Sequence, residues 1–189
     1  DKFDFEPKRD EFDYLYEVSR LSTLSGRKLH GKRNHIARFK DNPNWVYEPI
    51  TEENIAECYE MNKEWGKLYG GENEDSLKDE LFAVKEAFDH FFELKMLGGI
   101  IRQDGKIVAY TMASHLNSDT LDVNIEKAFH SIQGAYPMIN QQFILNACQD
   151  FKYVNREEDT GDEGLRKAKL SYVPDILLEK YTATLKEEK

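Results

Sequence analysis

The sequence predicts an α/β (α+β) domain with a mixed, mostly antiparallel sheet flanked by helices. Two observations lead to this fold class. The period of the apolar residues changes from 3.6 to 2 near Gly98-Gly99, where a helical stripe gives way to alternating strands. Asp104-Gly105 then separates two alternating stretches, which is a strong signal for a β-hairpin. The 189 residues are also enough to bury one sizeable core.

The first half of the chain is predicted to be mainly helical. The surest helix has a continuous apolar stripe that begins at Leu77 and reaches Leu94. A basic helix is expected before it, because Leu29, Ile36 and Phe39 form a narrow apolar stripe. The predicted elements are an arm at 1–13, a short helix or loop at 13–22, helices at 25–40, 51–69 and 76–97, and a strand at 45–50.

The second half is predicted to contain most of the sheet. Pro137 fits the first turn of a helix. The predicted strands are 99–102, 106–116, 119–126, 152–155 and 176–185, with helices at 137–148 and 164–172. No shift of composition divides the chain into separate domains.

The charge of the chain is acidic overall, with a net value of −10, but one segment is strongly basic. Residues 19–40 contain seven Lys and Arg and no Asp or Glu, so the rest of the chain carries −17. Two interpretations stay open. The helix is either solvated and paired with acidic neighbours, or it is an anion-binding surface for phosphate groups of RNA, lipid or a cofactor. The acidic remainder argues against DNA as a partner.

Several classes of protein are excluded by composition. Cys58 and Cys148 are 90 positions apart, which predicts two buried thiols in a reducing compartment. No apolar run reaches the roughly 18 residues that a membrane span needs. We therefore expect a cytoplasmic protein without a transmembrane segment, and a processed form or fragment, because the chain begins with Asp1. The five His follow no metal-ligand spacing, so no metal site is predicted.

Four segments together resemble a known family. The order of elements resembles the acyl-CoA N-acyltransferase fold, known as the GNAT fold. The segments are similar to the bacterial family named after the C-terminal domain of phosphatidylglycerol lysyltransferase. They are LSGRKLHGKRNHIARF at 24–39, IEKAF at 125–129, GAYPMINQQF at 134–143 and YVNREEDTGDEGLRKAKLSYVP at 153–174.

The resemblance implies both a domain organisation and a reaction. Soluble members of that family have two tandem GNAT-like halves, so residues 1–44 would end the first half and 45–189 would form the second. The membrane-bound lysyltransferases move an aminoacyl group from aminoacyl-tRNA to a lipid head group, and the related Fem transferases move it to a cell-wall precursor. The glycine pattern of CoA-binding GNAT proteins is absent, because SIQGAYP has one glycine. Family members often have a His at the position of Asn124.

The segment after the strand at 152–155 is the first candidate site. Arg156 is expected to hold a carboxylate or phosphate with two hydrogen bonds, and Glu157 or Asp159 to hold a substrate amine. Asn155 belongs to the same polar group, while Arg166 and Lys169 would form a second small basic group. The alternative is a turn held together by its own salt bridges.

Glu126 and Tyr136 are the predicted catalytic residues. The strand before Glu126 alternates, with Leu121, Val123 and Ile125 on one side, so Glu126 is predicted on the other face with Asn124 and Asp122. In the GNAT fold this strand lines the cleft, and a carboxylate there would act as a general base. The alternative is a solvated strand end.

Tyr136 lies four residues before Asn140, so the two project together from one helix. A phenol can donate a proton to a leaving group, and the alternative is a Tyr that packs its ring and bonds an amide. The donor would be steered by basic residues of the helix at 25–40, namely Lys28, Lys32, Arg33 and His35.

The sequence therefore predicts a GNAT-like transferase and leaves one rival interpretation. The transferase would pass an acyl, most plausibly aminoacyl, group from aminoacyl-tRNA or acyl-CoA to an amine or hydroxyl of a lipid head group or small molecule. Direct attack is expected, without a covalent intermediate and without a required cofactor, because no Cys or Ser nucleophile is evident. The rival is a non-catalytic module of the same fold that docks RNA, anionic lipid or a small metabolite.

Overall fold

The computed structural model describes residues 2–69 and 74–186, with the backbone alone for 74–79. Two sheets are present in this part of the chain. The larger sheet has seven strands in the order β3-β4-β5-β6-β7-β2-β8, and its only parallel pair is β6 with β7. These strands are β2 (Asp13–Glu17), β3 (Trp45–Pro49), β4 (Leu97–Gln103), β5 (Lys106–His115), β6 (Thr120–Ala128), β7 (Tyr153–Asn155) and β8 (Ile176–Leu178).

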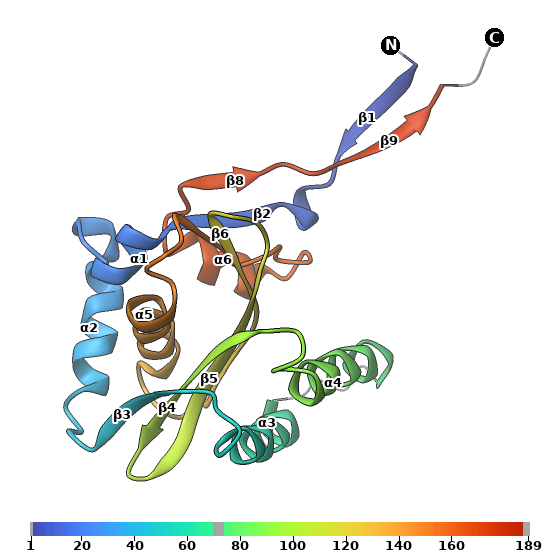
Figure 1. Cartoon of the computed structure of the whole chain (residues 1–189). Helices are drawn as coiled ribbons and strands as arrows, with labels where there is room; N and C mark the ends of the chain where they lie inside the picture. The colour runs from blue at the N-terminus through green and yellow to red at the C-terminus, as the bar shows by residue number, and fades with distance from the viewer. Residues whose placement is uncertain (1, 70–73, 187–189) are drawn as a thin grey trace.

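Helices cover both faces of this sheet, as Figure 1 shows. The cores on the two faces are separate clusters, one between the sheet and α5 with α1 and α2, the other between the sheet and α3 with α4. We call these faces the α5 face and the α3 face. The helices are α1 (Val18–Thr23), α2 (His30–Phe39), α3 (Ile55–Tyr69), α4 (Glu74–Asp89), α5 (Ala135–Ala147) and α6 (Glu163–Leu170).

The second sheet is a two-stranded ribbon that projects from the body of the domain (Figure 1). β1 (Phe3–Pro7) pairs antiparallel with β9 (Tyr181–Leu185), and both strands are exposed along their whole length. The predicted strand at 176–185 was therefore wrong as one element, because β8 and β9 belong to different sheets. The two residues between them, Glu179 and Lys180, carry the chain from one sheet to the other.

The predicted loop or short helix at 13–22 was also wrong over its first half. Residues 13–17 form β2, which lies between β7 and β8. Tyr14 and Tyr16 are fully buried on the α5 face, whereas Leu15 lies on the opposite side. This short alternation is typical of a strand, but only five residues carry it. The residues after it form α1, so segment 13–44 shares the sheet and core of the rest. Whether residues 1–44 end a preceding half stays a prediction.

The other elements lie close to their predicted places. The hairpin between β4 and β5 is confirmed, and its turn residues Asp104 and Gly105 both have positive φ, as a type I′ turn requires. The helix predicted at 76–97 ends earlier, at Asp89, and Gly98-Gly99 lies inside β4. Leu94 follows the helical stripe in sequence but is 60% exposed, because a turn replaces the last part of the helix.

The basic helix predicted at 25–40 begins later than expected, since a 3-10 turn at Arg27–Leu29 precedes α2 at His30–Phe39, and its apolar side packs on α5. Leu29, Ile36 and Phe39 are buried in the core of the α5 face. Gly134 is the point of closest approach, because a Cβ there would lie 2.2 Å from the carbonyl oxygen of His35. Gly134 also has a φ of +83°, so no other residue suits this position. The basic helix and the start of α5 are thus held side by side.

A β-bulge at Asn124 changes which way Glu126 points. Met112 of β5 pairs with Ile125, but the next residue, Ala113, pairs with Val123. Asn124 is therefore the extra residue, and the alternation of side chains shifts by one beyond it. The prediction that Glu126 shares a face with Asn124 and Asp122 was wrong for this reason, and Glu126 points to the α5 face.

Candidate functional site

The candidate site lies where β6 and β7 part, which we call the β6–β7 junction. β6 pairs with β7 only from Thr120 to Asp122, although β6 continues to Ala128. After Asn155 the chain follows β2, because the amide of Arg156 donates to the carbonyl of Tyr14 at 2.9 Å. The second half of β6 therefore has no strand partner on this side, and side chains occupy the space between the two strands.

On the α5 face of the junction, Glu126 and Arg156 form a largely buried ion pair. Arg156 Nη2 donates to Glu126 Oε1 at 2.8 Å, and Asn140 Nδ2 of α5 donates to Glu126 Oε2 at 3.2 Å. The side chains of Arg156 and Glu126 are 13% and 10% exposed. Burial is the largest single influence on Arg156 and opposes its charge, but the charge of Glu126, the two neighbouring tyrosines and the hydrogen bond to Glu126 together outweigh it, so the pKa of the guanidinium is raised.

Two polar atoms of this group have no hydrogen-bond partner among the described residues. They are Arg156 Nη1 and Asn140 Oδ1, both fully shielded from solvent. Asn140 as a whole is 2% exposed. Buried donors and acceptors are nearly always paired in folded proteins, so free ones at one place point to a ligand or bound water. Their arrangement would suit a ligand that accepts from Arg156 and donates to Asn140.

Two tyrosines support Arg156 from the side of α6. Its guanidinium carbon lies 4.9 Å from the ring centre of Tyr172 and 5.9 Å from that of Tyr16. Both phenols are nearly completely buried, which raises their pKa values. Sequence reasoning missed both. The alternation of Tyr14 and Tyr16 was the available signal, because it marks a buried strand face.

A cavity of about 510 Å³ opens beside this group between α2 and the start of α5. We call it the α2–α5 cavity. Lys32 and His35 line it from α2, and residues 129–137 line it from the other side. Lys32 Nζ lies 4.0 Å from the ring centre of Tyr172. Burial, with a smaller contribution from Arg156, lowers the pKa of Lys32 to about 8. Lys32 is thus brought close to Arg156, with Tyr172 in contact with both, whereas His35 lines the same cavity.

Aromatic rings form the outer edge of the same cavity. The predicted catalytic residue Tyr136 lines it, and its hydroxyl lies 3.4 Å from His130 Nε2. His130 stacks on Tyr69 of α3 with ring centres 4.2 Å apart, and Trp65 packs against both. Burial raises the pKa of Tyr136. The phenol therefore keeps its proton at neutral pH, as a proton donor must.

The opposite side of the junction carries two carboxylates that form no ion pair with any Lys or Arg in the described part of the chain. We call Asp122, Asn124 and Glu157 the acidic face. Asn124 Nδ2 donates to Asp122 Oδ2 and to Glu157 Oε1, both at 3.3 Å. Burial, then the charge of Asp122, raises the pKa of Glu157 to about 7. Burial, then the charge of Asp13, raises the pKa of Asp122 to about 6. Asn155 lies beside this group and donates to Asp13 at 3.2 Å.

Three predicted site residues are used by internal contacts instead. Asp159 is fully buried and accepts from Tyr14 at 2.5 Å, from Gly161 and from both Arg9 and Arg166. These contacts hold its pKa well below the usual range, chiefly through Arg166. Lys169 is 8% exposed and donates to the carbonyls of Arg156, Glu157 and Glu158. This cluster fixes the loop that presents Arg156 and Glu157, and it leaves Asp159 no exposed surface.

The basic helix keeps most of its charge unpaired. Among the described residues, Arg20 forms an ion pair with Asp175, but no carboxylate pairs with the other six cations of the segment. These six are Arg27, Lys28, Lys32, Arg33, Arg38 and Lys40. Arg33 donates to the carbonyls of Leu24 and Gly26, so it caps the preceding turn. Lys28 and His35 are exposed. The interpretation that acidic neighbours neutralise this helix finds no support in these contacts.

Two further features bear on the class of protein. In the described part of the chain, no helix is long and apolar enough to cross a bilayer, and no cluster of His, Cys, Asp and Glu is arranged to hold a metal ion. Cys58 and Cys148 are free, fully buried thiols in different cores. Burial raises their pKa values, which suits neither for a nucleophilic role.

The fold and the junction define a GNAT-like domain. A tandem GNAT protein from the clavulanic acid biosynthesis pathway has the same fold, with a TM-score of 0.50 and 9% identity over 95% of this chain and 54% of that chain.

The chain belongs to the family described as phosphatidylglycerol lysyltransferase, C-terminal, whose sequence profile matches residues 1–184. A conserved protein of unknown function from Bacteroides thetaiotaomicron VPI-5482 is 45% identical, with a TM-score of 0.94 over 98% of this chain and 63% of that chain. L-PGS from Bacillus licheniformis is 16% identical, with a TM-score of 0.63 over 100% of this chain and 63% of that chain. The chain thus spans less than two thirds of each of these proteins.

Proposed function

We propose that this chain carries the acyl-transfer site of an enzyme that moves an acyl, most simply an aminoacyl, group to an amine or hydroxyl acceptor. The β6–β7 junction is the observation that carries the proposal. One of its faces holds a buried cation with a free donor atom, beside a basic cavity. Its other face holds carboxylates with pKa values near neutral. Acyl transfer needs both kinds of group, one for developing negative charge and one for a proton.

The donor is proposed to approach from the α5 face. Six unpaired cations on or near α2, with Lys32 and His35 inside the α2–α5 cavity, would attract a phosphate-rich molecule. Aminoacyl-tRNA fits better than acyl-CoA. The guanidinium of Arg156 lies beside the rings of Tyr16 and Tyr172, and Gly134 is the only glycine in the segment SIQGAYP that enters α5, so the glycine pattern of CoA-binding GNAT proteins is absent.

The proposed reaction is a direct transfer in which atoms and charge balance. The acceptor nitrogen or oxygen attacks the carbonyl carbon of the donor ester, and its proton passes to a carboxylate. The carbonyl oxygen, which gains negative charge, accepts a hydrogen bond from Arg156 Nη1. The ester C–O bond then breaks, and the leaving oxygen takes a proton from Tyr136, which is restored from the protonated carboxylate through solvent. The products are the acylated acceptor and the free hydroxyl of the donor.

Glu157 is the better candidate for the proton acceptor than Glu126. Both oxygens of Glu126 are already engaged, one by Arg156 and one by Asn140. Its proposed role is to orient these two side chains. Glu157 has a pKa of about 7, and a general base works best when its pKa lies near the working pH. Glu126 as the base, which the sequence predicted, stays the alternative assignment.

A non-catalytic module is the second candidate function. The closed Glu126–Arg156 pair favours it, because a filled junction needs no substrate to be stable. Such a module would bind RNA or anionic lipid through α2 alone. Its affinity would fall steeply with salt and would not depend on whether an aminoacyl group is present.

The first experiment compares binding of aminoacylated and deacylated bulk tRNA at low and moderate salt. Tighter binding of the aminoacylated form supports the transferase. Equal binding of both forms supports the docking module, and no binding of either contradicts tRNA as the donor. Release of labelled amino acid to an added panel of amines and lipid head groups then tests transfer itself.

Matched variants test the assignment of the site. Arg156→Lys and Glu157→Gln are expected to lower transfer by at least about a hundredfold, the usual size of a lost oxyanion donor or general base. Glu64→Gln, an exposed change on α3, serves as the control and should leave transfer unchanged. Full transfer by both site variants would rule out this junction as the reactive centre.

A further inference from the structure

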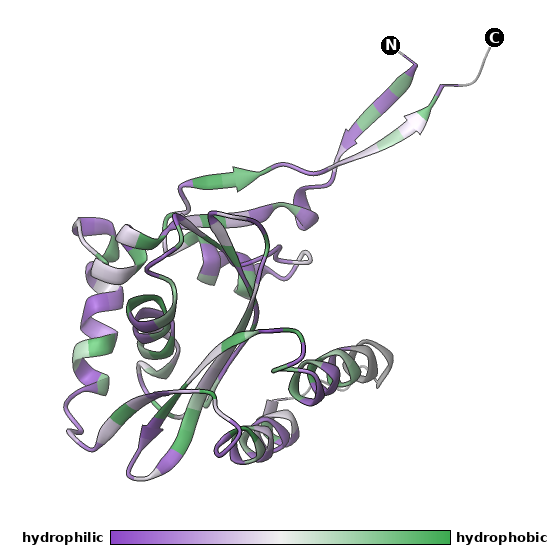
Figure 2. Cartoon of the chain, in the orientation of Figure 1, coloured by the Kyte–Doolittle hydropathy of each residue, from purple (hydrophilic) through white to green (hydrophobic). Residues whose placement is uncertain are grey.

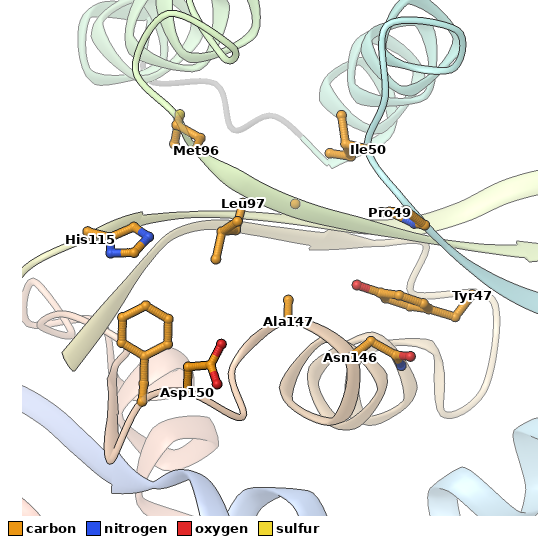
Figure 3. Close-up of a pocket in the computed structure, with 11 residues that line it drawn as sticks. Tyr47, Pro49, Ile50, Met96, Leu97, His115, Asn146, Ala147 and Asp150 are labelled. Atoms are coloured by element: carbon orange, nitrogen blue, oxygen red, sulfur yellow. The ribbon is translucent and has the colours of Figure 1, made fainter. Parts of the chain in front are cut away.

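A second cavity lies at the opposite end of α5 from the α2–α5 cavity. Its volume is about 690 Å³, which is within the usual range of small-molecule sites. It opens between the C-terminal end of α5, the start of β4 and the end of β5, as Figure 3 shows. We call it the Tyr47–Asp150 cavity. Asn146, which lines this cavity, follows Tyr136 of the α2–α5 cavity by about ten residues of α5, or roughly 15 Å of helix.

The walls of this cavity are mainly apolar. Met96 and Leu97 lie at the start of β4, and Ile50 follows β3 (Figure 3). Phe151, which follows α5 in the chain, also lines the cavity. The ring of Phe151 packs edge-on against His115, with ring centres 4.9 Å apart. Tyr47 is held over the backbone of β4, because a Cβ at Gly99 would lie 2.5 Å from its hydroxyl oxygen. This part of the cavity wall therefore depends on the close packing of the Tyr47 ring against Gly99.

Three polar side chains face this cavity without a hydrogen bond or ion pair to any described residue. They are Tyr47, His115 and Asp150. Burial raises the pKa of Tyr47, so its hydroxyl stays protonated. Asn146, on the last turn of α5, donates a hydrogen bond from its side-chain amide to the carbonyl of Gln142 at 2.7 Å. Tyr47, His115 and Asp150 come from different sides of the cavity (Figure 3) and are free to contact a ligand.

The charge of the cavity is negative. Asp150 is its only acidic lining residue in the described chain, and neither Lys nor Arg lines it. The C-terminal end of α5 meets the cavity at Ala147, and the free carbonyls of a helix end favour a cation. The aromatic faces of Tyr47 and Phe151 also attract cations.

From this arrangement we infer that the Tyr47–Asp150 cavity is a binding site for a small primary amine with an apolar or aromatic body. The ammonium group lies against Asp150 and the end of α5, and the body packs between Phe151 and Leu97, which lie on the same face of the sheet. Tyr47 supplies a further hydrogen bond. The site does not depend on the proposed transfer reaction, because it shares no lining residue with the β6–β7 junction or the α2–α5 cavity.

The test uses three probes of similar shape and different charge. Phenethylamine, phenethyl alcohol and phenylacetate are titrated into the labelled protein, and amide NMR shifts are followed at Gly98, Ala147 and Phe151. We expect saturable shifts with phenethylamine, at least about fivefold weaker binding of the alcohol, and no binding of the acid. Equal binding of amine and alcohol, or no saturable shift with the amine, overturns the inference.

Two variants and a control separate the charge from the cavity. Asp150→Asn should weaken phenethylamine binding about fivefold and leave the alcohol unaffected. Ala147→Leu should weaken both probes, because it fills the hollow and keeps Asp150. Asp41→Asn removes an equally exposed carboxylate just beyond the end of α2 and should change neither. If Asp41→Asn weakens the amine as much as Asp150→Asn does, the attraction is not local and the site is rejected.

Discussion

The two faces of the β6–β7 junction hold ionisable groups in opposite states. On the α5 face, Glu126 is paired with Arg156 and bonded by Asn140. On the acidic face, Glu157 and Asp122 lie together with only an amide between them. The hydropathy colouring in Figure 2 shows that hydrophilic residues interrupt the hydrophobic stretches along the strands of the sheet. Two carboxylates only one strand apart therefore differ in what they can do.

The difference shows how pairing decides between a structural and a chemical role. A carboxylate held by a guanidinium keeps its charge and fixes geometry. A carboxylate that is partly buried beside another carboxylate takes up a proton near neutral pH. The bulge at Asn124 produces this separation, because it turns Glu126 toward α5 while Asp122 and Asn124 stay on the other face.

The largest expected effect comes from breaking the paired face. Arg156→Ala leaves Glu126 buried without its cation, which should lower the free energy of unfolding by about 3 kcal/mol. Urea unfolding measures this loss. The double variant Arg156→Met with Glu126→Gln removes both charges and should recover most of it. A loss below about 1 kcal/mol in Arg156→Ala would mean that the pair is solvated and not a buried anchor.

Removing a charge from the acidic face should change the free energy of unfolding by a smaller amount, and above neutral pH it should stabilise the protein. The folded-state pKa of Glu157 is raised to about 7, so folding favours its protonated form. The stability that this gives is complete below the unfolded pKa and is lost as the pH rises through 7. Glu157→Gln should therefore be more stable than the parent chain at pH 8, by about 1 kcal/mol after allowance for solvent screening. Thermal unfolding at pH 5 and 8 measures this, and equal differences at both pH values would contradict it.

The coupling between the two carboxylates sharpens the comparison. Asp122→Asn removes the like charge next to Glu157 and should lower the pKa of Glu157, though less than full solvation would, because burial is the larger cause. Titration of the Glu157 carboxyl by NMR measures the change. An unchanged titration in Asp122→Asn would show that the acidic face does not act as one group.

The smallest expected effect concerns Lys32 at the donor side. Lys32→Met should weaken tRNA binding about fivefold and reduce the slope of affinity against salt by about one charge. Because the pKa of Lys32 is about 8, this contribution should fade as the pH rises above 8. Lys106→Met, an exposed change on β5, is the matched control. Equal effects of the two variants on tRNA binding would mean that α2 is not a specific binding surface and contributes only to the overall charge.

Much of the fold could be predicted from the sequence, because long periodic stretches carry it. The stripe of Leu29, Ile36 and Phe39 and the Asp104-Gly105 turn each depend on local pattern alone. The sequence did not predict that β2 is a strand, because two of its five residues are acidic and the alternation of apolar residues is short. Its burial depends on β7 and β8, which lie far along the chain.

The sequence identified several residues of the candidate site by their type, but it did not predict which residues they contact. Asn155, Arg156 and Glu157 stood out because they are polar at a strand end, and the structure brings Arg156 to Glu126. The prediction of the face on which Glu126 lies was wrong, because a one-residue bulge does not change the hydropathy pattern of a strand. Asp159, Arg166 and Lys169 were predicted as site residues for their charge. Only the three-dimensional contacts reveal that Asp159 pairs with Arg166 and that Lys169 donates to the backbone carbonyls of residues 156–158.

The rate of aminoacyl transfer as a function of pH tests the central claim most directly. Single-turnover loss of label from aminoacyl-tRNA would be followed between pH 5 and 9 for the parent chain, Glu157→Gln and Glu126→Gln. We predict a rate that rises with an apparent pKa of about 7 in the parent chain and in Glu126→Gln, and a slow, pH-independent rate in Glu157→Gln. A rise that survives in Glu157→Gln and disappears in Glu126→Gln would move the proton transfer to the paired face and contradict this account.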